Sequence, residues 1–343
     1  MPKITLKKIA AILGISPATV SKALKDYPDI SNDTKIKVKA LAESLNYKPN
    51  SFAQSLRNQE SKIIGLIIPK IVHHFFSNII NGVIDAASNK GYLVITLQSH
   101  ESYEQEKDQI NSLIEKNVDG ILISLSDHTV NYKHINAIIE KGVPVVLYDR
   151  TSKLVNCSKV IINDRKAGYE ATKYLIETGC RKIAHIRGPL KPQTTIDRFM
   201  GYKNALKEHD LPYDKNLVFE TEHLSFEDGF EVAEEIAKHR HDIDGVFSTT
   251  DLLATGVMVK LQQKGIKVPD DISIMGFSNW FLTKITTPTL STIDQPGYEM
   301  GRKTFDLLYD ELCQIKNGES VSHEVVEIAT RVVPRNSTKF IES

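Results

Sequence analysis

The sequence predicts a two-part fold, with an N-terminal all-α helix-turn-helix headpiece followed by an α/β body of two doubly wound parallel-sheet lobes. The first observation behind this prediction is a pair of short helical patterns that meet at a glycine, a serine and a proline. The second is the alternation, from residue 63 onward, of Ile- and Val-rich runs with amphipathic stretches. The third is the length of 343 residues, which leaves room for two or three folded units.

Charge is unevenly distributed along a chain that is neutral overall, with 43 Lys and Arg against 43 Asp and Glu. Residues 1–62 carry eleven basic and five acidic side chains, a net charge of +6, which leaves −6 on the remainder. Such asymmetry indicates a basic module that meets a polyanion, carried on an acidic body.

The cysteines and the N-terminus indicate the compartment. Three widely spaced cysteines, Cys157, Cys180 and Cys313, predict buried thiols and neither a disulfide framework nor a zinc cluster. The start "MPKITLKKIA" lacks the apolar core of a signal peptide, and runs such as "IIGLIIP" are too short to span a bilayer. We expect a cytoplasmic protein with no membrane partner, no metal and no cofactor.

The opening residues predict two helices joined by a tight turn. Thr5 can cap the first helix and Gly14 suits its end. Ser16 is a favourable N-cap, and Pro17 stands at the first helical position, where its missing N–H has no cost. A second helix over residues 17–24 completes a helix-turn-helix, in which the second helix enters the major groove of DNA.

The start of this second helix supplies the candidate base contacts. Pro17 and Ala18 offer apolar contact to a thymine methyl, whereas Lys22 can donate to guanine O6 and N7. Thr19 and Ser21 suit phosphates better. The predicted DNA-binding residues of the headpiece are Thr5, Leu6, Ser16, Pro17, Ala18, Thr19, Ser21 and Lys22.

A third helix is predicted from a Ser31 cap to Leu45. Its expected inward residues are Ile36, Ala40, Leu41 and Leu45, and its expected outward residues are Lys35, Lys37 and Lys39. Three helices of this kind can bury a small core.

The next stretch, "YKPNSFAQSLRNQESK", has two interpretations. Pro49 ends regular structure, and residues 51–57 make at most two helical turns, which need packing or a ligand to persist. The segment is either a plain linker or a hinge helix that folds on DNA, with Leu56 as an apolar wedge in the minor groove. Its candidate DNA-binding residues are Asn50, Ala53, Leu56 and Arg57.

The motifs "TLKKIAAILGISPATVSKAL", "YKPNSFAQSLR" and "IIGLIIP" resemble, in order and spacing, the lactose-repressor (LacI/GalR) family of bacterial transcription regulators. The resemblance implies a homodimer whose paired hinge helices bend a palindromic operator. Lys22 stands where that family often has arginine, so it lacks the rigid bidentate fork of a guanidinium.

The body contains more strands than one sheet normally holds, which predicts two lobes. The expected strands cover 63–69, 92–99, 119–126, 143–149, 159–164, 182–188, 217–222, 244–250 and 271–278, with later pieces at 290–296 and 323–328 around a long helix from residue 298 to about 315. These later pieces indicate that the chain crosses back between the lobes. This body resembles the family's effector domain, which shares the periplasmic sugar-binding fold, and the likeness extends to about Asn336.

The expected domains follow from this pattern. They are residues 1–49 (DNA binding), 50–62 (hinge helix and linker), 63–336 (effector binding and dimerisation) and 337–343 (tail). The N-lobe is expected at about 63–158 and 292–320, and the C-lobe at about 159–290 and 321–336, with the first boundary near residues 156–159.

Ligands of open α/β sheets bind beyond the carboxyl ends of the strands. Residues that follow the expected strands include arginines, carboxylates and aromatic rings, which suit a polyhydroxylated ligand because charged groups fork onto hydroxyls and rings pack on its apolar face. The candidate effector-binding residues are His73, Phe75, Phe76, Ser124, Asp149, Arg198, Asp251, Phe277, Ser278 and Trp280, and His74, Asp127, Arg150, Asp164, Arg187 and Asn279 start loops at the same ends.

The resemblance assigns some of these residues. "TIDRFMGY" matches the family's effector-cleft arginine at Arg198, "TTD" matches a polar cleft position at Asp251, and "HHFF" matches its aromatic loop. "GFSNW" departs from the pattern, because many relatives have an aspartate at the position of Ser278. Trp280, the single tryptophan, is expected either to shape the pocket or to pack in the core.

Two other functions compete with DNA-binding regulation. An enzyme is disfavoured because GxSxG, HExxH, GxGxxG after a strand and GxxxxGK[ST] are all absent from the sequence. "HRHD" (His239, His241 and Asp242) is either a metal site or an exposed loop, and "ESYEQEKDQ" is expected to be the solvated start of a helix. A periplasmic sugar-binding protein without DNA function would need an export signal and would have no use for a basic helix-turn-helix.

The sequence therefore predicts a dimeric DNA-binding transcription regulator, a repressor, controlled allosterically by a small molecule of the carbohydrate class. Inducer and co-repressor action both remain open, as does a protein partner. The tail "VPRNSTKFIES" lacks apolar heptads, so a dimer rather than a coiled-coil tetramer is expected.

Overall fold

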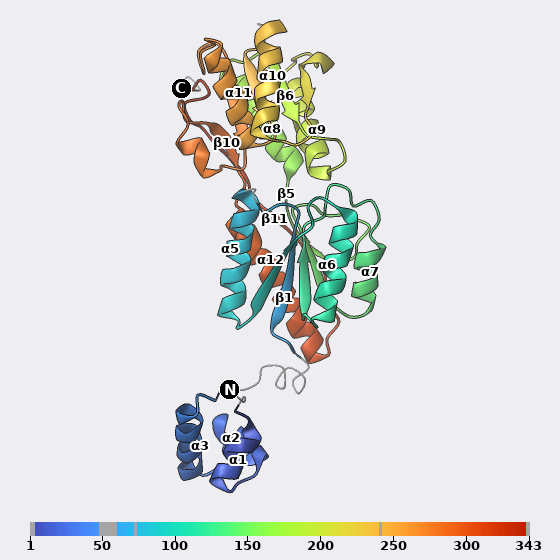
Figure 1. Ribbon diagram of the computed structural model, residues 1–343. Helices are drawn as coiled ribbons and strands as arrows, with labels where there is room; N and C mark the ends of the chain where they lie inside the picture. Colours follow the sequence, from blue (N-terminus) through green and yellow to red (C-terminus); the bar gives the residue numbers. More distant parts are fainter. Residues whose placement is uncertain (1–3, 48–59, 72–73, 240–241, 341–343) are drawn as a thin grey trace. The chain divides into compact units, whose positions relative to one another are not determined.

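The computed structural model describes residues 4–47, 60–71, 74–239 and 242–340. It divides into two compact units, residues 1–61 and 62–343, which are described separately (Figure 1). In the described part of the chain, no helix is both long and apolar enough to cross a membrane.

The first unit contains helices α1 (Leu6–Leu13), α2 (Pro17–Leu24) and α3 (Asn32–Ser44). The predicted helix-turn-helix is confirmed in its local detail. The Thr5 side chain accepts a hydrogen bond from the Lys8 amide at the start of α1, and α1 ends at Gly14 with φ of +65°. The Ser16 hydroxyl caps α2 by accepting from the Thr19 amide at 3.0 Å, with Pro17 at the first helical position. The core consists of Ile9, Ala10, Val20, Ala23, Val38 and Ala42.

The predicted inward face of α3 is wrong for two of its four residues. Ile36 is 67% exposed and Ala40 is also exposed, whereas Val38 and Ala42 are buried. Both sets recur at helical spacing, and only the position of α3 against α1 and α2 selects one of them. Leu41 and Leu45 do pack against the core, as predicted.

The second unit contains two sheets, each with six strands among the described residues. The N-lobe sheet has the order β11-β5-β4-β3-β1-β2 and the C-lobe sheet the order β12-β10-β9-β8-β6-β7. The N-lobe strands are β1 (Ile63–Ile68), β2 (Leu93–Gln98), β3 (Gly120–Ile123), β4 (Val145–Tyr148), β5 (Ser158–Ile162) and β11 (Val325–Ile328). The C-lobe strands are β6 (Ile183–Arg187), β7 (Val218–Glu220), β8 (Gly245–Ser248), β9 (Ser273–Phe277), β10 (Ser291–Asp294) and β12 (Arg331–Val333). Strand pairs are parallel except β10 with β12, so the doubly wound parallel prediction holds for both lobes.

Helices flank both sheets (Figure 1). The N-lobe has α5 (His74–Asn89), α6 (Tyr103–Glu115), α7 (Lys133–Glu140) and α12 (Gly297–Asn317). The C-lobe has α8 (Asp164–Glu177), α9 (Gln193–Glu208), α10 (Phe226–His239) and α11 (Asp251–Gln263), with short 3-10 helices η1 (Lys215–Leu217) and η2 (Phe281–Lys284).

Helices α8 and α9 approach each other at backbone contact because of two glycines. A Cβ added at Gly168 would lie 2.4 Å from the Arg198 carbonyl oxygen, and one at Gly201 would lie 2.2 Å from the Arg165 carbonyl oxygen. Neither position has room for a side chain. The close packing at these glycines places Arg198 of α9 near the first residues of α8.

The chain crosses between the lobes at other points than expected. Strand β5 pairs with β4 in the N-lobe sheet, so the first crossing follows Ile162 rather than residues 156–159. β10 belongs to the C-lobe and β11 to the N-lobe, which reverses the expected assignment of both segments. Each segment was recognisable as a strand, but the sheet that a strand joins depends on its pairing partners, which its own pattern does not contain.

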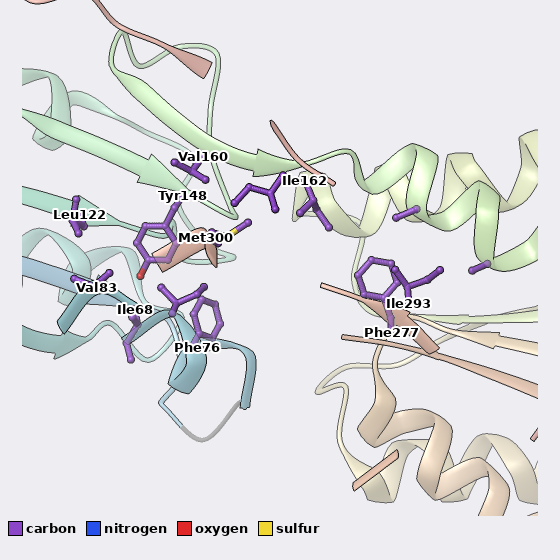
Figure 2. Packing of buried hydrophobic residues seen from close by; sticks show 14 of the residues in the cluster. Ile68, Phe76, Val83, Leu122, Tyr148, Val160, Ile162, Phe277, Ile293 and Met300 are labelled. Carbon is purple, nitrogen blue, oxygen red and sulfur yellow. The ribbon is translucent and has the colours of Figure 1, made fainter. Parts of the chain in front are cut away.

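One cluster of buried hydrophobic side chains contains residues of both lobes (Figure 2). Figure 2 shows Tyr148, Phe76 and Met300 gathered in the N-lobe, while Phe277 and Ile293 lie together in the C-lobe. The hydroxyl of the fully buried Tyr148 donates to the Ile67 carbonyl at 2.9 Å, and burial raises the pKa of this phenol well above its usual value.

Candidate functional site

The exposed face of α2 carries the residues predicted to read DNA. Pro17, Ala18 and Lys22 are exposed, whereas Val20 and Ala23 of the same helix are buried. Thr5 and Ser16 are exposed as well, and Leu6, Thr19 and Ser21 are half-buried. Among the predicted DNA-binding residues that the structure describes, Lys22 is the one cation, and the others are polar or apolar.

That cation has a partner that the sequence did not indicate. The Lys22 ammonium forms an ion pair and hydrogen bond with the Asp29 carboxylate, and both side chains are about half exposed. The hydrogen bond with Asp29 raises the pKa of Lys22, and the same bond lowers the pKa of Asp29. Lys22 must leave Asp29, or share it, in order to reach a base edge.

Five predicted site residues fall outside the described part of the chain. They are Asn50, Ala53, Leu56, Arg57 and His73.

A cavity of about 250 Å³ lies between the lobes, at the carboxyl ends of their strands. Eight of the predicted effector residues line it: Phe75, Phe76, Asp149, Arg198, Asp251, Phe277, Ser278 and Trp280. His74, which also starts a loop in the sequence-based prediction, lines it as well. Ser124 differs from the prediction, because it is fully buried and is not among the lining residues. Arg187, which also starts a loop, pairs with Glu220 at 2.6 Å instead.

Arg198, on α9, is held in one orientation by three elements of the C-lobe. Its Nε donates to Asp164 Oδ1 at 2.8 Å, and its Nη1 donates to the Thr249 carbonyl at 3.0 Å. The guanidinium lies 3.7 Å above the centre of the Phe277 ring, within cation–π range. Burial outweighs the attraction of Arg198 and raises the pKa of Asp164 to about 6.

Asp251, the first residue of α11, uses both carboxylate oxygens on the protein itself. Oδ2 accepts from the Trp280 amide at 2.7 Å and Oδ1 accepts from the Thr292 hydroxyl at 2.6 Å. Burial raises the pKa of Asp251 to about 6. Asp251 therefore lines the cavity mainly as the residue that positions the loop before Trp280.

This loop has a strained backbone. Ser278 and Asn279 have φ of +107° and +54°, a region that side-chain-bearing residues rarely adopt. The Asn279 amide donates to the Thr292 hydroxyl at 3.2 Å, and its side-chain oxygen accepts from Arg335 at 2.6 Å. Surrounding hydrogen bonds thus hold a conformation that the local sequence alone would not favour.

An aromatic contact joins the lobes at the cavity. The His74 ring of α5 lies 5.9 Å from the Trp280 ring at an interplanar angle of 22°, a stacked arrangement. Partial burial lowers the pKa of His74. Trp280 is half-buried and lines the cavity, so the pocket-shaping interpretation holds for it rather than core packing.

A charged cluster borders the cavity on its N-lobe side. Arg150 Nη1 lies 2.7 Å from Glu101 Oε2 and 2.5 Å from Asp127 Oδ1. Asp149 Oδ1 accepts from Gln295 at 3.3 Å. Burial raises the pKa of both Asp149 and Asp127. Beyond this cluster lies a second cavity of about 540 Å³, which shares Asp127, Asp149, Arg150, Pro192 and Thr194 with the first.

The expectation of a solvated helix start at "ESYEQEKDQ" is wrong for Glu106. Its side chain is fully buried, and its carboxylate accepts from the Ser126 amide at 2.8 Å, from the Thr129 hydroxyl at 3.0 Å and from His134 Nε2 at 2.8 Å. The available signal was the spacing of Glu106 with Ile110 and Leu113 on one face of the helix.

The two interpretations of "HRHD" stay untested, because His241 and the side chain of His239 lie outside the described part of the chain. The described member, Asp242, pairs with Lys182, with 2.5 Å between Oδ2 and Nζ. Within the described ranges, no group of three His, Cys, Asp or Glu side chains could hold a metal ion.

A small helix-turn-helix unit, joined to a two-lobed α/β unit with a ligand-sized cavity between its lobes, defines a class of proteins: DNA-binding transcription regulators that respond to a small molecule. Residues 5–50 match the model of the "Bacterial regulatory proteins, lacI family", and residues 64–316 match that of the "Periplasmic binding protein domain". The chain belongs to the lacI family of bacterial regulatory proteins.

Three relatives illustrate the likeness. The chain is 34% identical over 337 residues to the HTH-type transcriptional repressor PurR of Vibrio parahaemolyticus, with 98% of each chain covered. It is 27% identical to the transcriptional regulator CelR in its cellobiose complex, with a TM-score of 0.73 and coverage of 98% and 100%. It is also 27% identical to a LacI family regulator of Enterococcus faecium with bound ribose, with a TM-score of 0.70 and coverage of 80% and 98%.

Replacement of Asp29 tests the pairing of the reading cation. In Asp29→Asn the ammonium of Lys22 is released and a negative charge is lost, so we expect binding to random-sequence duplex DNA at low salt to strengthen roughly threefold, the scale of an exposed ion pair. Fluorescence anisotropy measures the change. The matched control is Asp26→Asn, which frees Lys39 of α3. An equal gain in both variants would show that only the general charge matters.

Burial of Asp251 predicts a pH-dependent stability difference. Because its folded-state pKa of about 6 lies above the ordinary value of 3.8, the stability that its protonated form contributes is complete below pH 4 and is lost as the pH rises through 6. Relative to Asp251→Asn, the wild type should lose roughly 3 kcal/mol of unfolding free energy between pH 4 and pH 7, at about 1.4 kcal/mol per pKa unit. Urea denaturation at stepped pH measures this difference, with the exposed Asp270→Asn as control. A difference that stays constant with pH would contradict the burial argument.

Proposed function

We propose that the protein is an operator-binding repressor that acts as a homodimer, and that a sugar or sugar derivative in the cavity between its lobes sets its affinity for DNA. The repressor name of the PurR relative supports the first part, and the cellobiose and ribose complexes of two other relatives support the second. Arg198 is the observation that carries the proposal. It is a buried cation with fixed orientation, set among aromatic rings at the junction of the two lobes.

For DNA we retain the sequence-based assignment. Pro17 and Ala18 contact a thymine methyl, Lys22 donates to a guanine, and Thr19 and Ser21 contact phosphates. Thr5, Leu6 and Ser16 complete the set of DNA-binding residues. The exposure of Thr5, Ser16, Pro17, Ala18 and Lys22 supports this assignment.

The domain roles are part of the same proposal. Residues 1–49 bind DNA, residues 50–62 form the hinge helix and linker, residues 63–336 bind effector and dimerise, and residues 337–343 form a tail. Asn50, Ala53, Leu56 and Arg57 contact the minor groove, with Leu56 as the wedge.

The cavity suits a polyhydroxylated ring. Phe75, Phe76 and Trp280 offer apolar faces, and Arg198, Thr249 and Ser278 offer donors and acceptors. The Thr249 hydroxyl is buried without a hydrogen-bond partner among the described atoms, so a ligand hydroxyl can satisfy it.

We propose further that the chain is not an enzyme and that it acts in the cytoplasm. The transcriptional-repressor names of its relatives support the first statement, and the location of operator DNA supports the second.

Arg198→Ala tests the effector site. Removal of the guanidinium also leaves Asp164 unpaired, so the effect of a saccharide effector on DNA affinity should fall at least tenfold while basal DNA binding persists. Footprinting on genomic fragments, with and without a panel of sugars, measures both properties. Lys267→Ala, which removes an exposed cation of the same lobe, is the control. An intact sugar response in Arg198→Ala would place the effector elsewhere.

Leu56→Ala tests the wedge. Without the leucine side chain, no apolar group inserts between the two unstacked base pairs. Operator affinity should therefore fall about tenfold (~1.4 kcal/mol), and DNA bending should decrease. Circular-permutation gel shifts report both effects, and Gln54→Ala in the same segment is the control. Unchanged operator affinity would remove Leu56 from the DNA interface.

A further inference from the structure

The second cavity of the cleft belongs to no part of the function described so far. It is about twice as large as the first, and the two linings share Asp127, Asp149, Arg150, Pro192 and Thr194. The two cavities therefore adjoin at these residues, and a ligand that occupied both would pass the side chain of Arg150.

Size separates the two cavities. Pockets for drug-sized ligands measure about 300–1,000 Å³. The first cavity, at about 250 Å³, lies just below this range, whereas both together fall within it. The first cavity on its own therefore suits a ligand below drug size, such as a single sugar ring.

The linings also differ in chemistry. Four aromatic rings of Phe and Trp line the first cavity, but Tyr132 is the one aromatic side chain among the described residues of the second. Its polar lining includes Thr151 and Ser152 from the N-lobe and Lys191 and Gln193 from the C-lobe. Charged side chains of Lys153, Asp164, Arg165 and Asp197 line it as well. Hydroxyls, an amide, carboxylates and cations from both lobes match the donors and acceptors of a hydroxylated ring.

The N-lobe wall is built to keep its shape. The loop that contains Ser126, Asp127 and Thr129 is fixed by two carboxylates from one segment of chain. The buried Glu106 accepts from Ser126 and Thr129, and Glu101 Oε2 accepts from the Asp127 amide at 2.9 Å. A buried carboxylate is costly unless it is fully hydrogen-bonded. Its use here indicates a preorganised surface rather than a passive solvent gap.

We propose that the second cavity is a subsite for a second sugar unit, so that the effector is an oligosaccharide of at least two rings with one ring in each cavity. The inference rests on the proposed sugar-responsive function. Because both lobes supply walls to the second cavity, the second ring adds contacts to each lobe. These contacts stabilise one position of the lobes relative to each other.

The test is calorimetric titration of the full-length protein with glucose and xylose and with their β-1,4- and α-1,4-linked dimers and trimers. At least one dimer should bind ten or more times tighter than its monosaccharide. Thr151→Trp, which fills the second cavity from the N-lobe wall, should remove this gain and leave monosaccharide affinity within twofold of the wild type. Thr151→Ser, which keeps the hydroxyl and adds no bulk, should retain the gain.

Three results would overturn the proposal. In the first, a monosaccharide binds the wild type as tightly as its dimers and trimers. In the second, Thr151→Trp keeps the dimer gain, which would place the second ring outside this cavity. In the third, Thr151→Trp weakens monosaccharide and dimer equally. Absence of binding by every sugar tested would instead overturn the sugar class of the proposed function, and this inference with it.

Discussion

The geometry of the cleft depends on the fixation of one buried cation, Arg198. An arginine that is 9% exposed would be costly without partners. Its partners come from the starts and ends of other elements: Asp164 begins α8, Thr249 directly follows β8, and the Phe277 ring ends β9. Asp164 of α8 can meet Arg198 because Gly168 and Gly201 allow α8 and α9 to pack at backbone distance. The glycines, which carry no functional group, thus bring the carboxylate within reach of the guanidinium.

Local features of the headpiece and the strands were predictable, because their signals lie within a few residues. Thr5, Ser16 and Pro17 act at the helix ends where their side chains predict, and the Ile- and Val-rich runs form the strands. The exposure of Ile36 and the sheet of β5 were not predictable, since each depends on which distant surface the element meets. The cleft residues were largely predicted because the carboxyl ends of parallel strands converge.

The hydrogen-bond partners of the predicted residues were beyond the reach of the pattern. Asp29 is exposed and close in sequence to Lys22, yet no periodicity marks it as the partner of that cation. Glu106 stands in a run of charged residues, and the groups that hydrogen-bond to its carboxylate lie about twenty or more residues away in the sequence. Asp251 was recognised as a cleft residue, but its use in holding Trp280 and Thr292 depends on the folded path of β9 and β10. Long-range polar pairs depend on the folded path of the chain, which local sequence patterns do not contain.

Ser278, where the sequence departs from the family pattern, connects the cleft to the segments that cross between the lobes. Its hydroxyl donates to Gln295 Oε1 at 3.2 Å, and the Gln295 amide group donates to Asp149 in the N-lobe. Gln295 follows β10 directly and so lies on the second crossing of the chain. Gln295 thus links Ser278 of the C-lobe to Asp149 of the N-lobe, so a ligand that hydrogen-bonds either side chain binds directly beside a contact between the lobes. Since coupling between two binding sites is reciprocal, an effector that changes the affinity for DNA has its own affinity changed by DNA to the same extent.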